Sequence, residues 1–199
     1  MTAPPHTLHA GVAEHGKVCA LRGEHVAALV HYRQAMSMAI GQRAAEVVVR
    51  HYLECALESL EHMAAHDEVL AYCDRAIEHY RARPPESALA RVDLASIHQR
   101  RGIALLKLKR HDEAARALEA ACATAQTAPA ELPLSHTLLR WLAAKLTISA
   151  QRLAAEQARH RYFSVRPENV RPSRAVPLPG QASTGPSRVV ATLGDSHAR

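Results

Sequence analysis

The stretch Glu14–Ala35, EHGKVCALRGEHVAALVHYRQA, decides the fold, because its small and aromatic residues follow a spacing that returns later in the chain. Gly16 opens the series, and its later members lie 12, 16 and 19 residues on, at Ala28, Tyr32 and Ala35. Residues 99–121, QRRGIALLKLKRHDEAARALEAA, repeat these intervals at Gly102, Ala114, Leu118 and Ala121. A shared four-point spacing of this kind indicates an internal repeat.

A third copy lies between these two, with one extra residue. It reads YLECALESLEHMAAHDEVLAYCDRA, lacks a turn glycine, and has its matching positions at Ala56, Val69, Cys73 and Ala76. Each copy fits two antiparallel helices, since residues three or four apart share one helical face. A small residue in the first helix lets the second approach closely. The chain is therefore predicted to form three helical hairpins in a row.

These residues resemble the tetratricopeptide repeat (TPR) family, with its small residue, Gly-acid turn, Ala, Tyr and Ala. The copies lie 41 and 45 residues apart, counted between Ala35, Ala76 and Ala121, whereas the family repeat is about 34 residues, so longer helices are implied. The resemblance covers residues 7–163 and implies a right-handed all-α solenoid. It also implies a groove along the first helices of the hairpins that binds a peptide or helix.

The expected helices are interrupted at glycine and proline joints. They span residues 7–21, 24–40, 43–63, 66–82, 86–108, 111–127 and 133–162. The last is expected to cap the third hairpin, because a solenoid must cover its terminal apolar surface, with Trp141 as a core anchor. Residues 1–6 are expected to fray. Residues 164–199 are rich in Pro, Ser and Arg and are predicted to be a disordered tail.

The resemblance also implies which residues would line the groove. They are charged or polar residues on the first helices of the hairpins: Glu14, Lys17, Glu54, Glu58, Glu61, Gln99, Arg100 and Lys107. Such a groove would be acidic in its middle and basic at the third repeat. Ala13 stands where chaperone-adaptor members have their first clamp lysine, so that carboxylate clamp is not expected. In the tail, the apolar residues Val189, Val190 and Leu193 form a second candidate, a docking motif after a flexible spacer.

Charge and hydropathy argue against two classes of partner, nucleic acids and membranes. The net charge of +6 is half contributed by the tail, and the remaining arginines are dispersed among few aromatics, which argues against nucleic-acid binding. No apolar run approaches the roughly 18 residues of a membrane span, and no signal-like segment begins the chain, so we expect a cytoplasmic protein without a membrane partner.

No motif for catalysis or for cofactor binding is apparent. The sequence has no phosphate-binding glycine loop and no nucleophile elbow, so no enzyme activity and no cofactor are expected. The four cysteines are widely separated and are interpreted as buried free thiols. His51 with Cys55, and His62 with His66, have a spacing that could serve a metal, but 14 histidines make such pairs common, and no metal site is predicted.

The sequence therefore favours a non-enzymatic protein-interaction module or scaffold. Two alternatives remain open: a regulatory domain that acts on transcription or signalling through a partner protein, and a secretion-type chaperone for an unfolded client. Homo-oligomerisation is also open, since the first hairpin has no visible cap.

Overall fold

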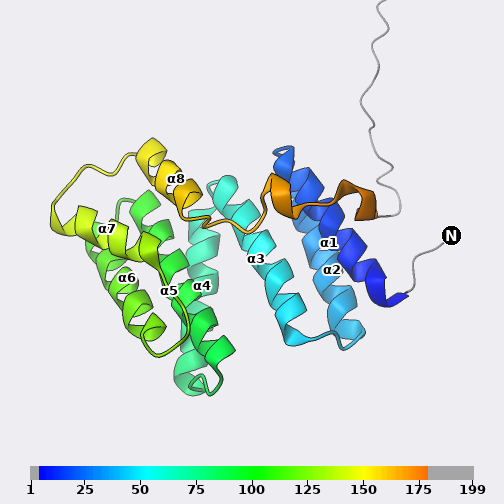
Figure 1. Cartoon of the computed structure of the whole chain (residues 1–199), viewed down its shortest axis with the longest axis horizontal. Coiled ribbons are helices and arrows are strands. Elements are labelled where there is room, and N and C mark those ends of the chain that lie inside the picture. Colours follow the sequence, from blue (N-terminus) through cyan, green and yellow to red (C-terminus); the bar gives the residue numbers. More distant parts are fainter. Residues whose placement is uncertain (1–4, 179–199) are drawn as a thin grey trace, which may run out of the picture.

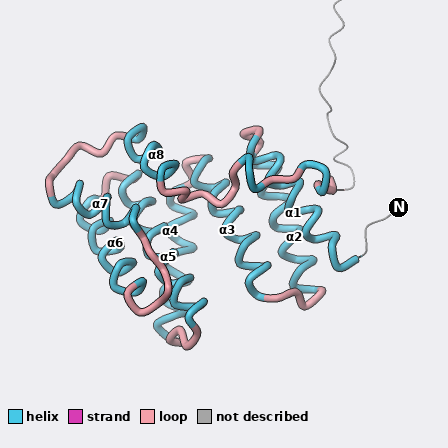
Figure 2. The backbone as a smooth tube through the Cα atoms, viewed as in Figure 1, coloured by secondary structure: helices cyan, strands magenta, loops and turns pink. Residues whose placement is uncertain are grey.

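The computed structural model describes residues 5–178, and within that range it contains helices and loops but no strands (Figures 1 and 2). The α-helices are α1 (Pro5–Leu21), α2 (His25–Gly41), α3 (Glu46–His62), α4 (His66–Ala82), α5 (Ala88–Lys107), α6 (His111–Ala125), α7 (Pro133–Ala143) and α8 (Ala150–Arg159). Two 3-10 turns follow, η1 (Pro167–Asn169) and η2 (Pro172–Arg174). The predicted all-α fold of successive helices is confirmed.

The first and third hairpins are packed tightly around their glycines. A Cβ atom added to Gly16 would lie 2.7 Å from Cε1 of Tyr32, and one added to Gly102 would lie 2.7 Å from Cγ of Leu118. Both large side chains are fully buried. The glycines therefore make the close approach that the repeat spacing predicts, in α1 against α2 and in α5 against α6.

The middle hairpin differs from its neighbours. Helices α3 and α4 touch over a much shorter stretch than α1 and α2 or α5 and α6, although α2 packs fully on α3 and α4 on α5. The two helices diverge away from their connecting turn, where Ala64 takes a left-handed conformation with φ of 58° (Figure 1). Ala56 occupies the position that is glycine in the other hairpins. The stack is consequently split between α3 and α4.

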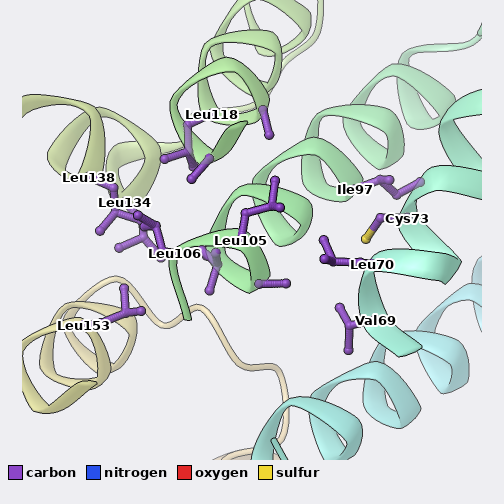
Figure 3. Packing of buried hydrophobic residues seen from close by; sticks show 14 of the residues in the cluster. Val69, Leu70, Cys73, Ile97, Leu105, Leu106, Leu118, Leu134, Leu138 and Leu153 are labelled. Carbon is purple, nitrogen blue, oxygen red and sulfur yellow. The ribbon is translucent and has the colours of Figure 1, made fainter. Parts of the chain in front are cut away.

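The apolar core follows this split. One set of clusters lies among α1, α2 and α3, around Tyr32 and Tyr52. A larger cluster spans helices α4 through α8 and contains Val69, Leu105 and Leu138 (Figure 3). Leu60 packs against both sets. The described part of the chain thus has two apolar cores that meet at α3.

The predicted capping helix is wrong in its extent. Residues 133–162 form two helices, because Lys145 takes a left-handed conformation after α7 and Ser149 starts α8 by accepting a hydrogen bond from the backbone N–H of Arg152. Helix α7 packs on α6, as expected for a cap. Trp141 packs against the larger cluster, with the Arg152 guanidinium 4.1 Å from its ring centre.

The tail prediction is wrong for residues 164–178. Together with Tyr162 and Phe163 these residues form a segment that leaves α8, crosses α3 and reaches α1 (Figure 1). We call residues 162–178 the C-terminal segment. The candidate docking residues Val189, Val190 and Leu193 lie outside the described residues. Within residues 5–178, no helix combines the length and apolar character needed to cross a membrane.

Candidate functional site

A buried polar cluster lies where the two cores meet. Arg100 of α5 is 5% exposed and donates to Glu61 and Glu54 of α3, with N–O distances of 2.5 Å for each. Lys107 pairs with the second oxygen of Glu61 at 3.2 Å. We call Glu54, Glu61, Arg100 and Lys107 the Arg100 cluster. It joins the first helices of the second and third hairpins by ion pairs rather than by apolar contact.

The charge on Arg100 is stabilised inside this cluster. Burial alone would lower the pKa of Arg100, but Glu54, Tyr162 and Glu61 outweigh burial and raise it well above its ordinary value. A buried guanidinium with two carboxylates is fixed in geometry as well as charge. The cluster therefore provides a rigid polar surface between α3 and α5.

A second polar group bridges the divergent ends of α3 and α4. Arg50 pairs with Asp93 of α5 and with Glu46, and the Tyr80 hydroxyl donates to Asp93 at 2.6 Å. These residues border a cleft of about 330 Å³ whose apolar wall includes Leu53. Polar contacts thus bridge the split between the two cores at two places, the Arg100 cluster and the group around Arg50.

The C-terminal segment begins on the Arg100 cluster. The Tyr162 hydroxyl donates to Oε1 of Glu61 at 2.8 Å, and its ring centre lies 5.4 Å from the Arg100 guanidinium, which is within range of a cation–π contact. After Phe163, the amides of Ser164 and Val165 donate to the two oxygens of Glu58 at 2.6 and 3.0 Å. One buried carboxylate of α3 thereby binds two successive peptide groups.

Covering Glu58 has an electrostatic cost. Burial raises the pKa of Glu58, although the amides of Ser164 and Val165 and the charge of Arg100 all favour its ionised form. Its exposed fraction is only 2%. Main-chain donors are therefore essential partners for this carboxylate when the segment lies over it.

The segment continues to the first hairpin. The backbone N–H of Arg171 donates to Glu14, which also pairs with Lys17 at 3.3 Å. Further on, the N–H of Val176 donates to the carbonyl of Gly11 at 2.9 Å. A Cβ at Gly11 would lie 2.5 Å from Cγ2 of Val176, so glycine is needed for this approach. The segment therefore contacts α5, α3 and α1 in turn, which we call the first-helix face.

Aromatic rings hold the bend between α8 and the segment. Phe163 lies against His62 with ring centres 4.5 Å apart, and His62 stacks on His25 at 4.8 Å with an angle of 8° between the planes. The two histidines end α3 and begin α2. Phe163 thus extends a stack that the helices already provide.

Cavities flank this aromatic stack. One of about 440 Å³ lies between α1, α3, α8 and the segment, and another of about 410 Å³ lies between α3, α5 and α8. Both are lined by His62, Gln157 and Phe163. Ser59 Oγ and Gln157 Nε2 are buried without a hydrogen-bond partner. Two open pockets therefore adjoin the first residues of the segment.

The structure brings most of the predicted groove residues together, but not as an open surface. Glu54, Glu61, Arg100 and Lys107 form one cluster, and Glu58 lies beside it under the segment. Lys17 is placed at the far end through Glu14. Gln99 is separate, because it donates to Ser135 of α7 at 2.8 Å. Glu58, Glu61, Gln99 and Arg100 are buried, which the expectation of exposed groove charges did not include.

Sequence reasoning missed the residues that occupy this face. Tyr162 and Phe163 are adjacent aromatics in a chain that is only 4% aromatic, and they follow directly on the last helix. That contrast in composition was a signal for a contact with the helical body. Gly11 was missed as well. Its close contact with Val176 could not be predicted, because Gly11 is not one of the residues in the repeat spacing.

Within residues 5–178, no three His, Cys, Asp or Glu side chains gather in a way that could hold a metal ion. The four cysteines are free thiols, of which Cys19, Cys55 and Cys73 are buried. No protein-family model, no curated protein and no solved structure matches this chain. Any function must therefore be argued from the first-helix face itself.

Proposed function

We propose that this chain is a non-enzymatic protein-interaction module of the tetratricopeptide type, which binds an extended segment of a partner protein across its first-helix face. The observation that carries the proposal is the course of residues 162–178, an extended segment lying on α5, α3 and α1. This is the face that the family resemblance assigns to ligands.

The chemistry of the face suits a peptide better than a small substrate. Its contacts to the segment are made largely to main-chain N–H groups, by Glu58, by Glu14 and by the Gly11 carbonyl. Peptide recognition through the main chain gives affinity, while neighbouring side chains select the sequence. The Arg100 cluster and the histidine stack would make that selection.

Selection of peptides from a random library tests the proposal. The bait is the full chain carrying Tyr162→Ala and Phe163→Ala, which releases the start of the segment while Glu61 keeps Arg100 and Lys107 as partners. We expect enriched peptides that bind with dissociation constants of roughly micromolar order, typical of short segments.

Two variants of the bait assign the binding to this face. Glu58→Lys should abolish binding of the enriched peptides, whereas Glu68→Lys, on the exposed surface of α4, should leave it unchanged. Circular dichroism confirms that each bait is helical. Failure to enrich any peptide on a folded bait, or equal binding to the Glu58→Lys bait, would refute the proposed function.

A further inference from the structure

The seat of Tyr162 is formed by the helices alone. Glu61 holds Arg100 and Lys107 without help from the segment, and these pairs fix the carboxylate oxygen that accepts the tyrosine hydroxyl. The Arg100 guanidinium lies near the ring. Such a site favours an aromatic ring with a hydrogen-bond donor at its tip, because Glu61 accepts and Arg100 attracts the ring face.

The next position is also selective. His62, at the end of α3, and His25, at the start of α2, are stacked nearly parallel, and Phe163 lies against His62. A flat apolar ring gains the most from this contact, because aromatic pairs add to the area they bury. The helices therefore offer adjacent sites for two aromatic residues.

The following two positions are read through the main chain. Glu58 accepts one N–H from each of Ser164 and Val165. Any residue except proline supplies that N–H, so the requirement is for two non-proline residues directly after the aromatic pair. Charge-assisted bonds of this kind are stronger than neutral ones.

The segment's own contacts leave room for competition. Cavities of about 440 and 410 Å³ adjoin the aromatic stack, and Ser59 and Gln157 retain buried polar atoms without partners. Apart from Val170, the side chains of residues 162–171 remain at least partly exposed. Tyr162 and Val165 are thus only partly buried where they pack against the edges of the two cores.

We propose that residues 162–165 stand in for the partner's peptide, and that the first-helix face recognises in trans an extended segment with tyrosine, a second aromatic residue and two non-proline residues in that order. The inference rests on the proposed function and specifies its ligand. The chain's own segment competes for the same contacts, so the partner binds only the fraction of molecules in which residues 162–165 are displaced.

A synthetic peptide of residues 160–170, carrying a fluorescent label, tests this by anisotropy against full-length chains. We expect it to bind the Tyr162→Ala, Phe163→Ala chain at least about tenfold more tightly than the wild-type chain, because wild type exposes the site only in its open fraction. Adding Glu58→Gln to the released chain should weaken binding by about tenfold, whereas adding Glu68→Gln should not.

Peptide controls examine the sequence rule. A peptide with Ser164→Pro and Val165→Pro, and another with Tyr162→Ala, should each bind the released chain at least about tenfold more weakly than the parent peptide. Equal binding of all three peptides, or no binding of the parent to a released chain that circular dichroism shows to be folded, would overturn the inference. Library selection that succeeds with unrelated sequences would leave the proposed function standing while this specificity fails.

A second copy of the chain is the competing occupant. Sedimentation of the wild-type chain at increasing concentration distinguishes it. We expect no dimer that depends on residues 162 and 163. A dimer of the wild type that disappears in the Tyr162→Ala, Phe163→Ala chain would assign the segment to exchange between copies and would overturn the proposal of a distinct partner.

Discussion

The outer hairpins and the middle one are built from the same repeat spacing, yet they are held together differently. In the outer pairs a glycine, Gly16 or Gly102, meets a large buried side chain, and the contact is apolar. In the middle pair α3 and α4 diverge, and ion pairs around Arg100 and Arg50 bridge from α3 to α5. One changed small residue, Ala56 in place of glycine, accompanies the change. Close packing and polar bridging are thus alternative solutions within one repeat pattern.

The largest effect is expected from removing the charge at the centre of the polar bridge. Arg100→Leu leaves Glu54 and Glu61 without their shared cation, and loss of one partner from a buried pair typically costs about 3–5 kcal/mol of unfolding free energy. Urea denaturation followed by circular dichroism measures the loss. Arg101→Ala is the matched control, since its pair with the more exposed Asp74 is worth about 0–1 kcal/mol. Equal, small losses of unfolding free energy for both variants would show that the Arg100 ion pairs contribute no more to stability than an exposed pair.

A smaller loss is expected from filling the close contact in the third hairpin. Gly102→Ala places a methyl group 2.7 Å from the Leu118 side chain and 3.3 Å from the Ala114 carbonyl, which should cost about 1–3 kcal/mol despite the better helix propensity of alanine. At Gly41 nothing lies within 4 Å of the added carbon, so Gly41→Ala should be neutral or slightly stabilising. Thermal unfolding compares the two. Recovery of stability in Gly102→Ala with Leu118→Ala would identify crowding as the cause.

Acidification should loosen α3 before α6, because the histidine of α6, His111, is exposed. Burial, assisted by Lys17, lowers the pKa of His51 in α3, so the unfolded chain binds more protons. The stability that neutral His51 provides is present above its unfolded pKa of about 6.5 and is lost as pH falls below it. Glu58 has the opposite sign, because burial raises its pKa and favours the folded form at lower pH.

Hydrogen exchange of α3 and α6 amides checks this order. Between about pH 7.5 and about pH 5.5, after correction for intrinsic rates, exchange in α3 should accelerate more than in α6. His51→Gln should reduce that difference, and His111→Gln, at the exposed start of α6, should not. An unchanged pH response in His51→Gln would attribute the effect to other groups.

The smallest effect distinguishes a glycine that serves the segment from those that serve the hairpins. Gly11→Ala should leave the helical body as stable as wild type, or more stable by up to about 1 kcal/mol, because alanine favours helix. It should nevertheless detach the end of the segment, since the added carbon would lie 2.5 Å from Val176. Faster exchange of the Val176 amide with an unchanged melting temperature is the expected result. A large fall in melting temperature would place Gly11 among the packing glycines.

Much of the helical architecture could be predicted from the sequence because it depends on local spacing. Gly16 with Tyr32 and Gly102 with Leu118 make the contacts that their intervals predict, and the first six helices lie close to their expected bounds. The break after α7 was missed because Lys145 adopts a positive φ without being glycine. The cap at Ser149 was a signal that the apolar pattern around it concealed.

The site was predicted only in part, because the segment that covers it comes from a distant part of the chain. The positions of Glu58, Glu61 and Arg100 follow from helical periodicity, and so does their nearness. Their hydrogen bonds to Tyr162, Ser164 and Val165 do not, since these partners lie more than 60 residues after Arg100. The segment buries a few apolar side chains, among them Tyr162, Val165 and Val170, and its N–H groups bind carboxylates on the helices as well. Composition alone carries no information about such pairing.

The C-terminal segment is synthesised after the helices that it covers. Helices α1 to α6 precede residue 162, and domains begin to fold while synthesis continues at about 5–20 residues per second. During that interval Glu58 and the Arg100 cluster exist on the nascent chain before their covering segment has been made. A partner of the proposed kind, present at the site of synthesis, would therefore meet an uncovered face for a short time, whereas one encountered later would have to displace residues 162–165.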